Sequence, residues 1–152
     1  MRSSPKRLVL VAMTAVGVMM PAAISSAIGG LPEYAGYAVG NHKVLVGFDL
    51  HGAGCPGSEC FDHHPHLVGF GPVGYDYPAC PELLDGVTEL KKPVAVGRNG
   101  SFEASGQGEY PGETVKVGGR FLDEGRRARG WFIVDNGGCL SARTRWTAKL
   151  ER

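Results

Sequence analysis

The chain has 152 residues, enough for one domain of ordinary size, and hydrophobic residues make up 43% of it, which allows a modest core. Its 16 basic and 15 acidic residues leave a formal net charge of +1 at pH 7. This near balance argues against a nucleic-acid-binding protein, because such proteins usually carry a strong positive field.

The N-terminus has the features of a secretory signal peptide. Arg2, Lys6 and Arg7 precede an apolar run over residues 8–24, and the small residues Ser, Ser and Ala follow at 25–27. A transmembrane anchor is the alternative for a run of this length, but Pro21 and the small residues favour cleavage. We therefore predict a signal peptide over 1–27 and a single secreted β domain over 28–152, with no membrane attachment after cleavage.

Charge is distributed unevenly along the predicted mature chain. Residues 33–112 hold 4 basic and 10 acidic side chains, whereas residues 113–152 hold 9 basic and 5 acidic ones. The C-terminal third is therefore expected to present a positive surface, although the mature domain as a whole is close to neutral.

The four cysteines are expected to form two disulfides. They are Cys55, Cys60, Cys80 and Cys139, and an even number in an oxidising compartment predicts complete pairing. Three pairings are open, and the spacing does not choose among them. Because Cys139 lies far from the other three in sequence, one bridge must join the two halves of the domain if all four pair.

The first part of the domain contains one clear strand between two segments without regular alternation of apolar and polar residues. Residues 28–40 are rich in glycine, alanine and proline and fit either a linker or a loosely held first strand. Lys43–Leu50 is a strand with Val44, Val46, Phe48 and Leu50 on its inner face. The alternation is lost over residues 51–80, which predicts a long Cys/His-rich loop with only a short strand at His66–Phe70.

The stretch over residues 94–150 predicts an antiparallel β-meander. Apolar residues alternate with polar ones, and turn residues separate the strands: Asn99-Gly100, expected as a type I′ hairpin turn, then Asp123-Glu124-Gly125 and Asn136-Gly137-Gly138. Trp146 is expected to be the largest core side chain. The predicted inward residues are Phe102, Ala104, Val115, Val117, Gly119, Phe121, Ala128, Gly130, Phe132, Val134, Leu140, Ala142, Thr144, Trp146, Ala148 and Leu150.

Together these patterns predict an all-β fold, either an antiparallel β-sandwich or a partly open barrel of about six to eight strands with a long disulfide-stapled loop. The block of Gly100-Ser101-Phe102, 117–121 (VGGRF), Ala128-Arg129-Gly130, Cys139 and 145–148 (RWTA) resembles the C-terminal half of small secreted β-rich proteins of actinobacteria. That resemblance covers residues 94–150 and implies a fold and a secreted location, but no reaction.

A cluster of histidines in the predicted loop is one candidate site. Imidazole and thiol groups so close in sequence suit zinc or copper, which prefer nitrogen and sulfur donors. An oxidising compartment favours disulfides over thiolate ligands, so the site would not use the cysteines. Its predicted ligands are His51, Asp62, His63, His64 and His66.

A basic ladder on the outer face of the meander is the second candidate site. If its strands are neighbours, the cations share one face with Trp131, which would act as a stacking platform for an anionic cell-wall polymer, a polysaccharide or a nucleic acid. Another secreted protein is the other possible partner. The alternative is a solvated face that only protects the sheet from aggregation. The candidate binding residues are Arg120, Arg127, Arg129, Trp131, Arg143 and Arg145, with Lys116 and Lys149 beside them.

Catalysis is not expected. The chain contains no Gly-x-Ser-x-Gly nucleophile elbow, no His-Glu-x-x-His motif and no phosphate-binding loop. The sequence thus predicts a non-catalytic secreted binding module, with a zinc- or copper-binding protein as the alternative.

Overall fold

The computed structural model describes residues 33–83 without 53–59, together with residues 85–151. The predicted signal peptide and Cys55 lie outside this part. Within it no helix is long and apolar enough to cross a membrane. The described residues form ten strands and two short 3-10 helices, namely β1 (Glu33–Ala38), β2 (Asn41–His51), η1 (Cys60–His63), β3 (His66–Tyr75), β4 (Gly86–Val87), β5 (Val94–Ala95), β6 (Ser101–Gln107), β7 (Glu113–Leu122), η2 (Asp123–Gly125), β8 (Arg127–Asn136), β9 (Cys139–Leu140) and β10 (Thr144–Leu150).

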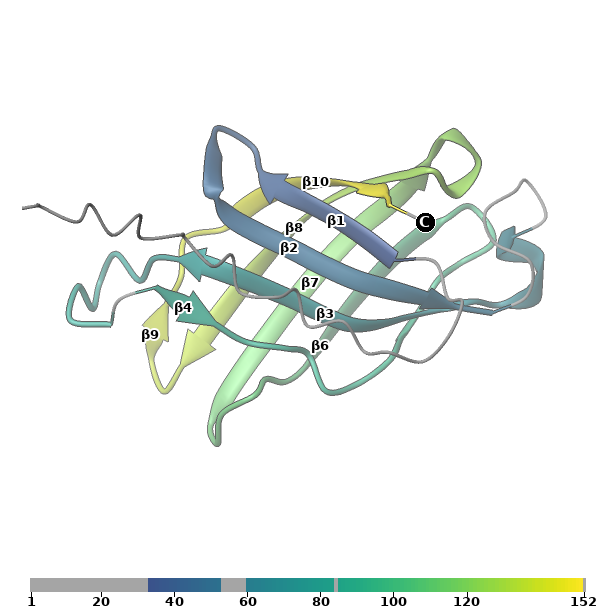
Figure 1. The fold of residues 1–152 in the computed structure, drawn as a ribbon. Coiled ribbons are helices and arrows are strands. Elements are labelled where there is room, and N and C mark those ends of the chain that lie inside the picture. Colours follow the sequence, from purple (N-terminus) through teal and green to yellow (C-terminus); the bar gives the residue numbers. More distant parts are fainter. Residues whose placement is uncertain (1–32, 53–59, 84, 152) are drawn as a thin grey trace, which may run out of the picture.

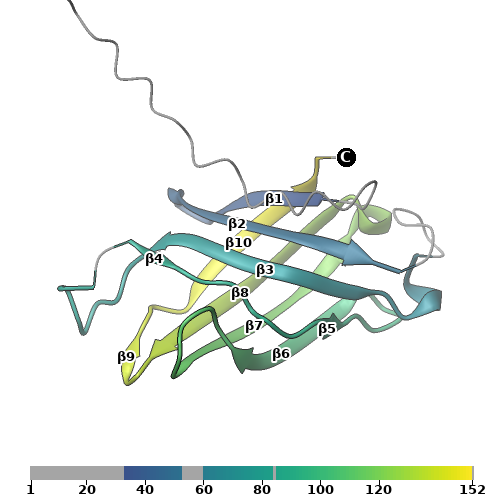
Figure 2. The same ribbon diagram turned by 60° about the horizontal axis from the view of Figure 1, so that its bottom comes forward.

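The strands form one antiparallel sheet that curls into a half-barrel (Figures 1 and 2). Their order is β4-β3-β2-β1-β10-β8-β7-β6, while β5 pairs with β3 and β9 with β8. The predicted all-β antiparallel fold is confirmed, in its form of a partly open barrel. Residues 28–40 were expected to form either a linker or a loosely held first strand. From Glu33 onward they form a strand, because β1 pairs with both β2 and β10.

The segment over residues 86–97 bridges the two ends of the curled sheet. On one side the Leu90 amide donates to the Phe70 carbonyl of β3 at 2.9 Å. On the other side the Lys91 amide donates to the Gln107 carbonyl of β6 at 3.2 Å. This irregular segment therefore satisfies backbone groups that would otherwise be exposed at both sheet edges.

The core is an aromatic cluster built around Trp146. This side chain is 1% exposed and is the largest of the fully buried ones, as predicted. Its ring lies 5.7 Å from that of Phe48 and 5.6 Å from that of Phe70, between centroids. The partner of Trp146 on the neighbouring strand β8 is Gly130, where a Cβ atom would meet the indole at 2.7 Å. A glycine opposite a large aromatic is thus what allows the ring to enter the core.

Strand β3 is longer than the sequence pattern predicts. It runs over His66–Tyr75, whereas a short strand at His66–Phe70 was expected within an irregular loop over 51–80. Gly69 and Gly74 have φ angles of +67° and +79°, and the register shifts near Gly74. These bulges interrupt the alternation of side chains, which hides the strand in the sequence.

The inward and outward positions just before β10 also differ from the prediction. Leu140 and Ala142 were expected to point inward, but both are exposed, and Ser141 is buried at 6% exposure. The Ser141 hydroxyl accepts a hydrogen bond from the Val134 amide at 2.9 Å. Residues 141–143 do not belong to a strand, so the alternation of β9 does not continue into β10.

The turn after β5 lies where it was predicted but has another type. A type I′ turn needs positive φ at both central residues, and only Gly100 has it, at +77°. The Gly100 amide donates to the Gly97 carbonyl, and the Asn99 Oδ1 atom accepts from the Ser101 amide at 3.0 Å. The Asn99 side chain therefore stabilises a turn with a glycine bulge.

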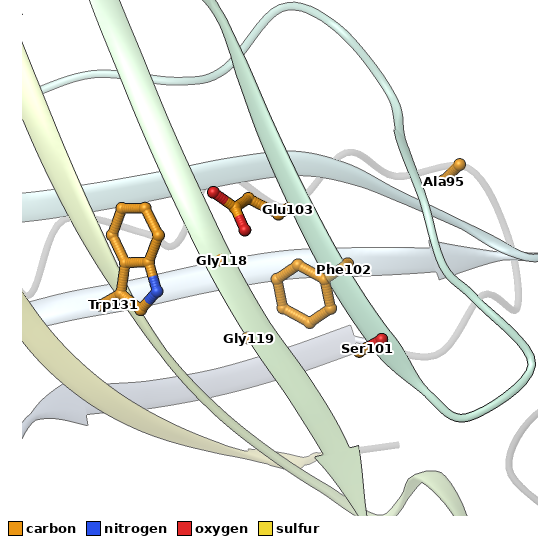
Figure 3. A pocket seen from close by; sticks show the side chains of 7 residues that line it. All are labelled: Ala95, Ser101, Phe102, Glu103, Gly118, Gly119 and Trp131. Atoms are coloured by element: carbon orange, nitrogen blue, oxygen red, sulfur yellow. The ribbon is translucent and has the colours of Figure 1, made fainter.

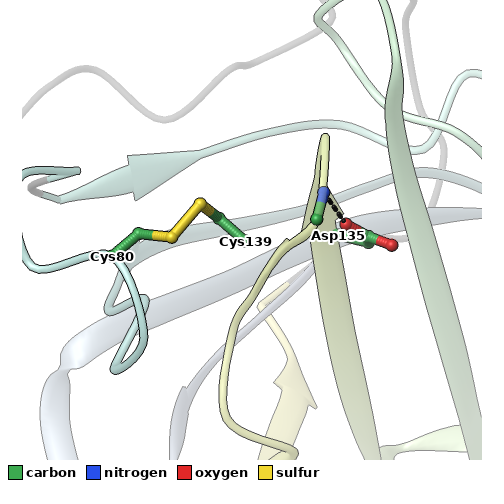
Figure 4. The surroundings of a disulfide bond; sticks show 4 residues. Cys80, Asp135 and Cys139 are labelled. Atoms are coloured by element: carbon green, nitrogen blue, oxygen red, sulfur yellow. Dashed lines mark hydrogen bonds between the residues drawn. A yellow bond between two sulfur atoms is a disulfide. The ribbon is translucent and has the colours of Figure 1, made fainter.

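A disulfide joins Cys80, in the turn after β3, to Cys139 at the start of β9, with a Cα–Cα distance of 5.9 Å (Figure 4). Next to Cys139, the Gly138 amide donates to Asp135 Oδ1 at 2.8 Å and closes the hairpin turn. The bridge joins the two halves of the domain, as was predicted for one bridge if all four cysteines pair. The remaining predicted pair is then Cys55 with Cys60; Cys55 and the Cys60 side chain lie outside the described part of the structure.

Candidate binding surface

The outward faces of β7, β8 and β10 carry the predicted basic ladder. The register places Arg120 directly opposite Arg129, and Arg127 directly opposite Lys149. Pairs of like charge in these positions repel each other and destabilise a sheet unless an anion compensates them. All of these cations are exposed, and the complete set on this surface, which we call the basic face, is Lys116, Arg120, Arg127, Arg129, Arg143, Arg145 and Lys149.

Two cations of the basic face have carboxylate partners. Arg127 forms an ion pair with Asp123 in η2, and Lys149 forms one with Glu151 at 3.3 Å. Within the described residues no other ion pair occurs, so Arg120 and Arg129 face each other and neither forms an ion pair. The centre of the basic face is therefore the part best suited to hold an external anion.

One face of the Trp131 ring is covered by Arg143, and its role as a stacking platform for a ligand stays a prediction. The guanidinium carbon of Arg143 lies 4.1 Å from the centroid of the indole ring. Beneath the ring is Gly118, where a Cβ atom would meet indole atoms at 2.9 Å, and this glycine is buried although it points outward. Trp131 is thus held between a glycine and an arginine. Stacking restricts the guanidinium while its N–H donors stay available to an oxyanion.

A hollow of about 480 Å³ lies beside Trp131 and extends over β6 and β7 (Figure 3). Glu103 and Trp131 stand on either side of Gly118, in one row across three strands. The alternation of β6 places Glu103 and Ser101 on the outer face, but only the strand register reveals that they lie near Trp131. The hollow is lined by Ala95, Ser101, Phe102, Glu103, Gly118, Gly119 and Trp131.

The predicted metal ligands lie near each other without forming a three-ligand group. His51 and His66 are opposite partners in the ladder between β2 and β3, while Asp62 and His63 lie in η1 and His64 follows with a φ of +53°. Among the described residues, the one set of three groups within 4.8 Å of one another is Cys80, Glu82 and Cys139, and its two sulfurs form the disulfide. Zinc or copper binding by the histidines stays a prediction.

A buried polar cluster joins β7 to the β3 and β4 side of the half-barrel. Glu113 is 2% exposed, and its carboxylate accepts hydrogen bonds from the Thr88 hydroxyl, the Tyr110 amide at 3.3 Å and the Tyr75 hydroxyl at 3.5 Å. Burial, together with the hydrogen bond to Tyr77, raises the pKa of the Tyr75 phenol. The cluster lies in the interior, so it stabilises the fold rather than contacting a ligand.

No protein-family model, curated protein or solved structure matches this chain. The resemblance of residues 94–150 to secreted actinobacterial proteins therefore stays a prediction.

Proposed function

We propose that this chain is a secreted, non-catalytic binding domain that attaches to an acidic polymer through its basic face. The observation that carries the proposal is the facing pair Arg120 and Arg129, neither of which forms an ion pair within the described part of the chain. An anion placed between the two guanidinium groups would remove their repulsion. The bridge between Cys80 and Cys139 supports secretion, since such bonds persist in oxidising compartments.

Binding to an acidic polymer is tested with poly-L-glutamate, and neutral dextran serves as the control polymer. The protein is expected to bind poly-L-glutamate but not dextran, and binding should weaken as salt is raised because exposed charges are screened. Arg129→Glu should weaken binding about tenfold by reversing a central charge.

The same substitution separates loss of binding from loss of folding. Arg129→Glu turns a repulsive cross-strand pair into an attractive one, so the urea midpoint should stay the same or rise slightly. Lys91→Glu is the matched control, because Lys91 is exposed and lies outside the basic face. Equal weakening by both variants, or binding that is insensitive to salt, would refute the proposal.

A further inference from the structure

The hollow beside Trp131 differs in chemistry from the rest of the basic face. It contains a carboxylate, that of Glu103, and a hydroxyl, that of Ser101, next to an indole ring. It is an open depression of about 480 Å³ on the surface of the sheet. Glu103 lies on β6, at the margin of the basic face, and its carboxylate repels a ligand that is uniformly anionic, so the hollow suits a ligand of another kind.

We infer that the hollow is a sugar subsite and that the acidic polymer recognised by the basic face is a polysaccharide with carboxylated sugar units. This inference rests on the proposed function and adds the chemical class of the ligand. A sugar ring brings hydroxyl donors that a carboxylate such as Glu103 accepts, and apolar C–H groups that contact the edge of the indole lining the hollow. Its own carboxylate reaches outward to the surrounding arginines.

The cations around the hollow are placed to receive that carboxylate. Arg120 is the ladder partner of Ser101, and Arg145 is the ladder partner of Trp131. Arg143 is stacked on Trp131 at 4.1 Å, which holds its guanidinium beside the hollow. A ligand with hydroxyl groups between its charges can therefore donate to Glu103 and contact the arginines at the same time, whereas poly-L-glutamate has no hydroxyl groups.

Two variants test the hollow without touching the arginines. Glu103→Ala removes the hydroxyl acceptor. Gly118→Ala places a methyl group where indole atoms lie 2.9 Å away, which forces the half-buried Trp131 side chain to shift and changes the wall of the hollow. Glu109→Ala is the matched control for the first variant, because Glu109 is an exposed glutamate that does not line the hollow.

The experiment compares polygalacturonate, a carboxylated polysaccharide, with poly-L-glutamate of similar length at the same salt concentration. The wild-type protein should bind polygalacturonate about tenfold more tightly, as expected for added hydrogen bonds to a charged group. Glu103→Ala should weaken polygalacturonate binding and slightly strengthen poly-L-glutamate binding, since it removes a repelling charge. Gly118→Ala should abolish the preference, and Glu109→Ala should retain it.

The outcomes separate this inference from the proposed function. Equal binding of both polymers by the wild-type protein, or a preference that survives in both Glu103→Ala and Gly118→Ala, overturns the sugar subsite and leaves the acidic-polymer proposal standing. Failure to bind either polymer overturns the proposed function and the subsite with it. Urea midpoints of the variants show that each one is folded.

Discussion

Replacing the pair Cys80 and Cys139 by serine should destabilise the domain by about 4 kcal/mol. The two residues are 59 positions apart in sequence, and in the chain-entropy model a cross-link of that length removes this much conformational entropy from the unfolded chain. Both cysteines also pack partly against the core, which adds to the loss. Because domains of this size are stable by only about 5–15 kcal/mol, the effect is a large part of the total.

Urea unfolding followed by tryptophan fluorescence measures this effect. The double serine variant avoids a single free thiol, which would exchange with other cysteines. The control is the double serine variant at Cys55 and Cys60, whose predicted bridge closes a far shorter loop and is worth about 2 kcal/mol in the same model. A loss below about 1 kcal/mol for the Cys80 and Cys139 variant, or a larger loss in the control, would refute this account. It would show that closing the long loop in the unfolded chain is not the source of the stabilisation.

Three further predictions concern the interior. Glu113→Ala should cost about 3 kcal/mol in urea unfolding because buried donors lose their acceptor, and Glu113→Gln should cost less; equal effects would contradict this account. Trp146→Phe should cost less than about 1.5 kcal/mol, against about 3–5 kcal/mol for Trp146→Ala, because the buried indole Nε1–H lacks a partner among the described residues. Burial raises the pKa of Tyr34 to about 12, so the unfolded state releases its proton first and stability should fall as pH rises from 10 to 12, as seen in urea midpoints; in Tyr34→Phe this fall should be weaker.

The strands of the second half could be predicted because one face of each is buried. On β7, Val115 and Val117 are fully buried while Lys116 between them is exposed, so the alternation in the sequence is the alternation in space. Strand β3 lacks this regular alternation of buried and exposed side chains, because two glycines with positive φ introduce bulges along it. Tertiary pairing with β2, rather than any pattern in β3 itself, makes that segment a strand.

The residues of the basic face were predictable, but their arrangement was not. Alternation places Arg120 and Arg129 outward on their strands, whereas only the register shows that they face each other. Arg143 lies in the irregular segment between β9 and β10, where alternation carries no information, and so its contact with Trp131 could not be foreseen. The hollow with Glu103 could not be predicted either, since it depends on which residues lie opposite each other across three strands.

The candidate site and the core are built from the same glycines. Gly118 points outward and supports Trp131, while its neighbour Gly119 points inward, where a Cβ atom would meet the Phe102 ring at 2.6 Å. Two adjacent residues of β7 thus make room for one aromatic ring on each face of the sheet. Since β7 is hydrogen-bonded on both sides, by β6 and β8, it cannot shift to accommodate a larger residue at either position. The position of Trp131, and with it the stacked Arg143 and the wall of the hollow, is therefore fixed by a rigid strand rather than by a loop, as a preformed binding site requires.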